Sequence, residues 1–245
     1  MRPLHIEEPT EFGRILDQTV DFSACDRTRG ENRSKRLAGV VTTSVWLLLV
    51  GCGFAAVMFE RTTPGTQGAP PGMWPDDSGF DRNEGRPTLL LFAHPRCPCT
   101  RATLNELAHI LVQAPTCMPA RIVFYRPDSS DPAWTDTDIV RQARRLTGAT
   151  VEWDDDGQLA RRFDVRTSGH VLLFDPHGQL VFSGGITAMR GHEGINAGRT
   201  TIVNYARGEP PATPCTPVFG CSLLGSCRLD SKSDVKCRNP NSPSR

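Results

Sequence analysis

The sequence predicts an α/β domain, with a central mixed sheet flanked by helices, behind a single N-terminal transmembrane helix. Three observations lead to this prediction. An apolar run without a charged residue extends from Leu37 to Phe59. After it, short apolar segments alternate with segments of helical periodicity, which is typical of parallel strands joined by helices. The series closes with two apolar runs around a turn, which predicts an antiparallel hairpin, and with a last helix.

The composition fits one domain of ordinary size with extensions. The chain has 245 residues, 38% of them hydrophobic, so it is long enough to bury a core. Its formal net charge of +1 gives no indication of nucleic-acid binding. The 22 Gly and 20 Pro indicate substantial loops and tails. The most informative count is that of the nine cysteines.

The order of these features predicts five parts. They are a basic cytoplasmic N-terminal segment (1–36), a transmembrane anchor (37–59), a linker (60–85), the folded domain (86–208) and a cysteine-rich C-terminal tail (209–245).

The apolar run is long enough to cross a bilayer, for which about 20 residues suffice. Basic residues crowd its N-terminal side and only Arg61 follows closely, so the positive-inside rule places the N-terminus in the cytoplasm. We therefore expect a single-pass protein of the inner (cytoplasmic) membrane, with its domain on the periplasmic or extracytoplasmic side. A buried core helix is disfavoured because the run is apolar on every face. An alternative is an export signal, since Leu49–Cys52 resembles a bacterial lipobox with Cys52 as the lipidated residue.

The domain begins with a strand, a helix and a second strand. Leu89–Phe92 is a short apolar run, as in a buried strand. Pro98–Val112 carries apolar residues at helical spacing, and Ala120–Tyr125 predicts the next strand.

The later segments continue the alternation. We expect a helix, a short strand, a helical turn, two strands of a hairpin and a final helix, over residues 135–146, 149–153, 159–163, 170–175, 179–182 and 196–207 respectively.

Two cysteines lie where the first strand gives way to the first helix. Pro98 suits the first helical position, which makes Cys97 the expected N-cap and places Cys99 in the first turn. The free N–H groups and the positive dipole of a helix start stabilise a thiolate. We predict that Cys97 is the nucleophile, because it is nearer the exposed end, and that Cys99 resolves the mixed disulfide.

This segment resembles the active-site region of the thioredoxin superfamily, in which a core strand runs into Cys-x-x-Cys at a helix start. Phe92 precedes Cys97 by the spacing of that family, and the likeness covers residues 86–208. One departure is that Cys97-Pro98-Cys99 has one residue between the thiols. A disulfide within Cys-x-Cys closes a small ring, and strain would make it easily reduced.

A second departure precedes the hairpin. Where the family has a cis-proline facing the cysteines, this chain has Gly169, so the cis peptide does not carry over. The hydroxyls of Thr167 and Ser168 can hydrogen-bond a thiolate or simply form a polar turn.

The segment after the hairpin contains two candidate site residues. In this fold that edge loop lies near the cysteines, so Arg190 and His192 are placed to lower a thiol pKa or move a proton. The more ordinary interpretation is a capping loop with solvated charges.

The combined pattern resembles the little-characterised RedB-like branch of membrane-anchored thioredoxin-like proteins, related to the anchored reductases of cytochrome maturation. Its motifs are His94–Cys99, Arg190–Gly194 and Val218–Cys221. The resemblance implies a thiol–disulfide oxidoreductase that exchanges disulfides with protein thiols and needs no cofactor.

The remaining cysteines leave alternatives open. Cys25 precedes the anchor, while an odd number lies on the outer side: Cys97, Cys99, Cys117, Cys215, Cys221, Cys227 and Cys237. Cys221 is either a resolving thiol for Cys97 or part of a tail held by two disulfides among its four cysteines.

Two other functions use the same residues. Cys97 and Cys99 are soft ligands suited to Cu(I), and His94, His170 or His192 can complete such a site, as in a metallochaperone. The other option is a noncatalytic scaffold whose cysteines form only structural bridges.

Overall fold

The structure is a computed structural model. It describes the backbone of residues 22–82, 85–114, 118–128 and 132–224, with side chains from residue 33 onward. The chain divides into two compact units, Met1–Val57 and Met58–Arg245.

The first unit is dominated by α1 (Phe22–Thr62), which continues a few residues into the second unit. Within the described residues it is the one helix long and apolar enough to cross a membrane, over Arg33–Thr62 with a mean hydropathy of 2.1. None of its apolar window is buried within the chain. A soluble core helix would be covered, so the buried-helix alternative is not supported, and α1 remains a candidate membrane span.

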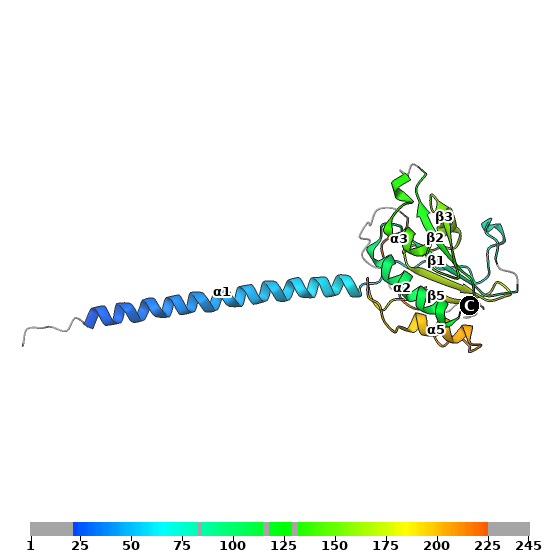
Figure 1. Cartoon of the computed structure of the whole chain (residues 1–245). Helices are drawn as coiled ribbons and strands as arrows, with labels where there is room; N and C mark the ends of the chain where they lie inside the picture. Colours follow the sequence, from blue (N-terminus) through cyan, green and yellow to red (C-terminus); the bar gives the residue numbers. More distant parts are fainter. Residues whose placement is uncertain (1–21, 83–84, 115–117, 129–131, 225–245) are drawn as a thin grey trace, which may run out of the picture. The chain divides into compact units, whose positions relative to one another are not determined.

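The second unit contains a five-stranded mixed sheet (Figure 1). The strand order is β3-β2-β1-β4-β5. The strands are β1 (Thr88–Ala93), β2 (Ala120–Arg126), β3 (Ala149–Asp155), β4 (His170–Phe174) and β5 (Leu180–Gly185).

Strand β1 is the centre of the sheet because it is buried on both faces along its whole length. It pairs in parallel with β2 and antiparallel with β4, with Phe92 opposite both Val123 and His170. Strand β3 extends the parallel half, and β5 closes the hairpin with β4. The predicted thioredoxin-like layout, a mixed sheet flanked by helices, is confirmed.

Helices α2, α3 and α5 cover one face of this sheet (Figure 1). Helix α4 packs on the other face. Their bounds are α2 (Pro98–Gln113), α3 (Asp138–Ala143), α4 (Gln158–Arg162) and α5 (Ala197–Ala206), with short 3-10 turns at η2 (Asp76–Ser78) and η3 (Pro132–Trp134). Alternate residues of β1 point to the two faces, so Leu91 packs under α2 and Phe92 packs toward α4.

Segments on both sides of the predicted domain pack against it. Trp74 is 9% exposed, and its ring meets Phe163 and Phe174 edge to face. Its backbone N–H donates to the carbonyl of Gly178. From the other end of the chain, Leu223 enters the same side of the core. The residues before and after the sheet therefore contribute to one packed unit.

Candidate functional site: three thiols at the start of α2

The two cysteines of the motif lie where the sequence predicts. Cys97 is the N-cap of α2 with an extended backbone (φ −86°, ψ 116°), and Pro98 follows at the first helical position. A turn after β1 sets this geometry, because the Cys97 N–H donates to the carbonyl of His94 and the Thr100 N–H donates to that of Cys97. Cys97 is therefore at the positive end of a helix of four turns.

The structure corrects the predicted exposure of the thiols. Cys97 is 1% exposed, whereas Cys99 and Cys221 are partly exposed. The expectation that Cys97 is the more accessible of the pair is therefore wrong. The reason is tertiary, since a segment far along the chain lies over the helix start and covers the Cys97 sulfur.

That covering segment carries Cys221. The Cys97 and Cys221 sulfurs are 2.9 Å apart although the residues are 124 positions apart in the sequence. A covalent disulfide is about 2.05 Å long, so these thiols are separate but need move only slightly to become bonded. Cys221 is a free thiol here, so the alternative of a tail stapled through Cys221 is not what the structure contains.

Backbone pairing holds the Cys221 segment in place. Ser168 N–H donates to the Cys221 carbonyl at 2.8 Å, and Leu223 N–H donates to that of Arg166 at 2.9 Å. Gly220 approaches this loop so closely that a Cβ on it would overlap the Ser168 carbonyl oxygen. A glycine is therefore required just before the distant thiol.

The other cysteines lie elsewhere or outside the described residues. Cys215 is disulfide-bonded, and Cys52 is a free, exposed residue of α1. The side chains of Cys25, Cys117, Cys227 and Cys237 are outside the described part of the chain.

The three clustered thiols differ in acidity. The pKa of Cys97 is lowered, first because the Cys221 thiol donates to its sulfur and next because the Cys99 thiol does so. The backbone N–H groups of Cys221 and Cys99 act in the same direction, and burial opposes them. Cys97 is therefore the site of the thiolate in the reduced protein.

The two flanking thiols are held in the protonated state. The pKa of Cys99 and that of Cys221 are both raised, first by donation to Cys97 and next by burial. The positive charge of Arg190 opposes both shifts, and the Gly191 N–H also favours a thiolate on Cys99. The negative charge therefore lies on Cys97, and the two flanking thiols donate hydrogen bonds to it.

Arg190 lies where the sequence predicts it, beside the thiols. Its side chain is 21% exposed, and Nη1 donates to the Gly220 carbonyl at 2.6 Å. Its Nε is 3.6 Å from a carboxylate oxygen of Glu60. The guanidinium therefore joins the loop after β5 to the segment that carries Cys221.

His192 is not brought to the thiols in the same way. It is exposed, and its backbone N–H donates to the Met189 carbonyl. Within the described residues, no hydrogen bond links its ring to a sulfur. The Gly191 amide, which the sequence did not single out, is the closer partner of Cys99.

A buried carboxylate holds this loop. Glu106 of α2 is 1% exposed and accepts hydrogen bonds from Gly194 N–H at 2.6 Å and from Arg199 Nη1 at 2.8 Å. It also lies 3.5 Å from Nδ2 of Asn196, the N-cap of α5. The helix that presents the cysteines therefore also fixes the loop that faces them. A glutamate on the buried side of a predicted helix was the available signal, and it was missed.

The hydroxyls before β4 serve the backbone. Ser168 Oγ accepts the His94 N–H at 2.9 Å and is 3.0 Å from Thr100 Oγ1. Thr167 Oγ1 donates to the carbonyl of Thr66. The first of the two sequence alternatives, a hydroxyl bound to a thiolate, is therefore not what these contacts form. Gly169 has φ +90°, and no cis peptide occurs within the described residues.

The histidines of the described residues are not grouped as a metal site. Burial lowers the pKa of His94, against the opposing charge of Cys97, and its Nδ1 accepts the Arg96 N–H. His170 is fully buried against Ser183, and burial lowers its pKa to about 4. In the described part of the chain, no group of three or more His, Cys, Asp or Glu is placed to hold a metal.

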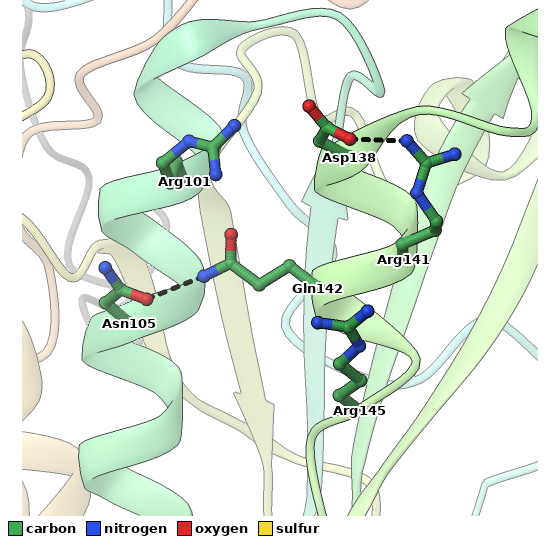
Figure 2. A pocket seen from close by; sticks show the side chains of 6 residues that line it. All are labelled: Arg101, Asn105, Asp138, Arg141, Gln142 and Arg145. Atoms are coloured by element: carbon green, nitrogen blue, oxygen red, sulfur yellow. Dashed lines mark hydrogen bonds and ion pairs between the residues drawn. The ribbon is translucent and has the colours of Figure 1, made fainter.

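An arginine-rich pocket of about 360 Å³ lies between α2 and α3 (Figure 2). Gln142 Nε2 donates to Asn105 Oδ1 at 2.6 Å across it, and Arg141 pairs with Asp138. Its lining residues are Arg101, Asn105, Asp138, Arg141, Gln142 and Arg145. None of them is a predicted site residue.

Comparison with known proteins gives structural likenesses only. No family model matches the chain, and no curated protein matches it. An uncharacterised conserved protein from Geobacillus kaustophilus is similar at 18% identity, over 67% of this chain and 93% of that one, with a TM-score of 0.49. A hypothetical protein from Sinorhizobium meliloti 1021 is also 18% identical, over 68% and 96% of the two chains, with a TM-score of 0.49. A secreted Mycobacterium tuberculosis disulfide oxidoreductase, described as homologous to E. coli DsbE, is 21% identical over 40% and 67%, with a TM-score of 0.33.

Proposed function

We propose that this protein is a membrane-anchored thiol–disulfide oxidoreductase that exchanges disulfides with protein partners through Cys97, Cys99 and Cys221. The observation that carries this proposal is the 2.9 Å approach of Cys97 and Cys221, two free thiols from distant parts of the chain, at the start of α2. Two thiols so placed form and break a disulfide with little rearrangement of the backbone.

The surroundings of these sulfurs suit the chemistry. The thiolate is the attacking species in disulfide exchange, and a thiol with a low pKa is also a good leaving group. Cys97 has its pKa lowered by the two neighbouring thiols and is at a helix N-terminus. Arg190 supplies a positive charge that favours a thiolate on either flanking cysteine.

The proposed location follows from α1 and from the basic residues before it. The uncharged run Leu37–Phe59 lies inside α1 and is exposed at every residue but the half-buried Met58, as expected of a helix that lipid surrounds. We propose that α1 spans the inner membrane. The positive-inside rule then places the N-terminus in the cytoplasm and the second unit on the extracytoplasmic side. A lipidated Cys52 would anchor the protein on the same side.

The finer family assignment is likewise a proposal. The motifs around Cys97, Arg190 and Cys221 resemble those of the RedB-like branch of anchored thioredoxin-like proteins. In this chain the three motifs come together at one site, which supports reading them as a unit. Their convergence gives no comparable support to a copper-binding metallochaperone, because in the described part of the chain no histidine is grouped with the sulfurs as a metal site.

The test is a redox titration of the full-length protein in detergent. The protein is equilibrated in glutathione buffers of graded ratio, its free thiols are alkylated, and its disulfides are mapped by mass spectrometry. We expect a reversible Cys97–Cys221 couple, whose midpoint potential shows whether the protein is a reductant or an oxidant. If no disulfide that contains Cys97 responds to the buffer, the proposed function is wrong.

A further inference from the structure

We propose that the three thiols form a relay in which Cys99 exchanges with the partner, Cys97 is the shared central sulfur and Cys221 pairs with Cys97 at rest. This inference rests on the proposed thiol–disulfide function. It adds which sulfur a partner reaches and in what order the disulfides form.

Accessibility separates the three roles. A sulfur that is 1% exposed, as Cys97 is, offers no room for the sulfur of another protein. Cys99 is partly exposed and follows Pro98, which is exposed. Cys221 is also partly exposed, but the residues just before it, Phe219 and Gly220, are buried. Both thiols are thus half-buried, with the buried Thr100 after Cys99 and the half-buried Ser222 after Cys221, and Cys99 differs in having an exposed residue before it.

The loop facing Cys99 is exposed. Gly191 supplies an N–H group to the Cys99 sulfur, and the residues from Gly191 to Ile195 are exposed. Ile195 is 83% exposed, which leaves an apolar side chain free at this edge. A partner chain that reaches Cys99 thus meets an accessible loop rather than a packed segment.

The two disulfides that Cys97 can form are unequal. A Cys97–Cys99 bond closes a small ring within one turn of α2, and such a ring departs from relaxed disulfide geometry. A Cys97–Cys221 bond joins residues 124 positions apart and carries no such ring constraint. The long-range disulfide is therefore the resting form, and the short-range one is the reactive form.

The oxidation of a partner dithiol then proceeds in three exchanges. First, the Cys99 thiolate attacks the Cys97 sulfur, the Cys97–Cys99 bond forms, and the Cys221 thiolate leaves and is protonated. Second, a partner thiolate attacks the Cys99 sulfur, a mixed disulfide forms, and the Cys97 thiolate leaves. Third, the second partner thiolate attacks the partner sulfur of the mixed disulfide, the partner disulfide forms, and the Cys99 thiolate leaves.

In total, these steps convert the Cys97–Cys221 disulfide into thiols and form one disulfide in the partner. The Cys97–Cys221 disulfide is reduced to two thiols by two electrons, and the partner dithiol is oxidised by two electrons. The same steps in reverse reduce a partner disulfide. Cys99 returns to its starting state in either direction, so it carries the exchange without storing oxidising equivalents.

The local electrostatics suit this order. The lowered pKa of Cys97 makes it the best leaving group when a partner attacks Cys99. The largest cause that raises the pKa of Cys99 is its donation to the Cys97 sulfur, which holds while Cys97 is a thiolate. Once Cys97 is bonded to Cys221 that cause disappears; burial still opposes the Cys99 thiolate, and Arg190 and the Gly191 N–H favour it.

The test compares Cys99→Ser, Cys221→Ser and the control Cys52→Ser as oxidised, full-length proteins in detergent. Reduced glutathione is the probe, with acid quenching, alkylation and peptide mapping. We expect Cys99→Ser to keep the Cys97–Cys221 disulfide at an equilibrium constant within about threefold of the wild type, yet to be reduced at least about a hundredfold more slowly. In the wild type the first glutathione adduct should be on Cys99.

Cys221→Ser gives the complementary result. Within the three-thiol cluster only the Cys97–Cys99 bond is then available to Cys97, and its equilibrium with glutathione should shift at least about tenfold toward thiols, which corresponds to about 30 mV. Cys52→Ser should match the wild type in both measurements.

The two proposals fail in distinguishable ways. If Cys99→Ser is reduced at the wild-type rate, or if the first wild-type adduct is on Cys221, the relay is wrong while the oxidoreductase function stands. The wild-type adduct map decides the question even if Cys99→Ser does not fold. If glutathione alters no disulfide of Cys97 in the wild type, the function itself is wrong.

Discussion

Cys97 has one neighbouring thiol that is local and another that is distant, and the two are held by different means. Cys99 is in the first turn of the same helix, so covalent geometry alone keeps it close. Cys221 is 124 positions away and reaches 2.9 Å only because the tail folds back over the helix start. One sulfur can therefore have a local and a tertiary thiol neighbour that are held in place by different contacts.

The supports of the two neighbours also differ. Cys99 faces a loop that Glu106 fixes through the Gly194 N–H and Arg199. Cys221 depends on backbone pairing with the loop before β4 and on the close approach of Gly220. Arg190 is common to both, because its charge acts on both thiols and its side chain binds the Gly220 carbonyl. The contacts that hold Cys99 and those that hold Cys221 can therefore be perturbed separately.

The largest effect is expected from removing the central sulfur. Cys97→Ser should abolish both disulfides of the three-thiol cluster, because Cys99 and Cys221 each pair with that residue, while the separate disulfide of Cys215 should remain. Disulfide mapping after oxidation with oxidised glutathione measures this, with Cys52→Ser as the control. A variant in which Cys99 and Cys221 form a disulfide with each other at the wild-type potential would show that Cys97 is not central.

A smaller, one-sided effect is expected from Gly220→Ala. The added methyl group must displace the Ser168 loop, which should cost about 1–3 kcal/mol of unfolding free energy and move Cys221 from Cys97. We expect the fraction of Cys97–Cys221 disulfide at a fixed glutathione ratio to fall while Cys97–Cys99 still forms.

Thermal unfolding and disulfide mapping together check this result. Gly72→Ala is the matched control, because a Cβ there meets no atom within 4 Å. Unchanged Cys97–Cys221 pairing in Gly220→Ala would contradict the role assigned to the tail.

The pKa of Cys97 also distinguishes its two neighbouring thiols, because they lower it to different extents. The Cys221 thiol is the largest cause that lowers the Cys97 pKa, and Cys99 is the second. In the reduced protein the Cys97 thiolate persists above its lowered pKa and is lost as the pH falls through it. Cys221→Ala, which removes the donor, should move that loss to higher pH by more than Cys99→Ala does. Thiolate ultraviolet absorbance against pH measures both, and the opposite order would contradict the ranking of the two neighbours.

The smallest effect is expected from Arg190→Gln. Losing the charge should raise the pKa of Cys99 and that of Cys221 and slow exchange with glutathione by about two- to fivefold, since less thiolate is present. Stopped-flow exchange rates measure this, with Arg145→Gln as a control from the arginine-rich pocket. Equal slowing in both variants would show a general effect of charge rather than a local one.

Local patterns in the sequence were sufficient to predict much of the fold and part of the candidate site. The apolar run of β1, the proline after Cys97 and the helical spacing beyond it predicted a helix start with two cysteines, and the structure has Cys97 as its N-cap. The hairpin of β4 and β5 could also be predicted from the sequence, because its two apolar runs flank a turn. These features depend on neighbours within a few residues.

The burial of Cys97 could not be predicted from such local patterns, and the prediction that it is the more exposed thiol was wrong. A helix N-cap is exposed by default, and only the returning tail covers this one. The Glu106 clamp on Gly194 was missed for the same reason, since it joins residues 88 positions apart.

The sequence by itself determined the candidate membrane helix, the order of strands and helices and the local cysteine pair, because periodicity, capping and covalent spacing act over short distances. The tertiary structure alone decided that Cys221 is the close partner of Cys97 and that Cys97 is the buried sulfur of the three. Both depend on the path of the tail, which runs beside β5 and the loop before β4 and is fixed by hydrogen bonds between residues far apart in the chain.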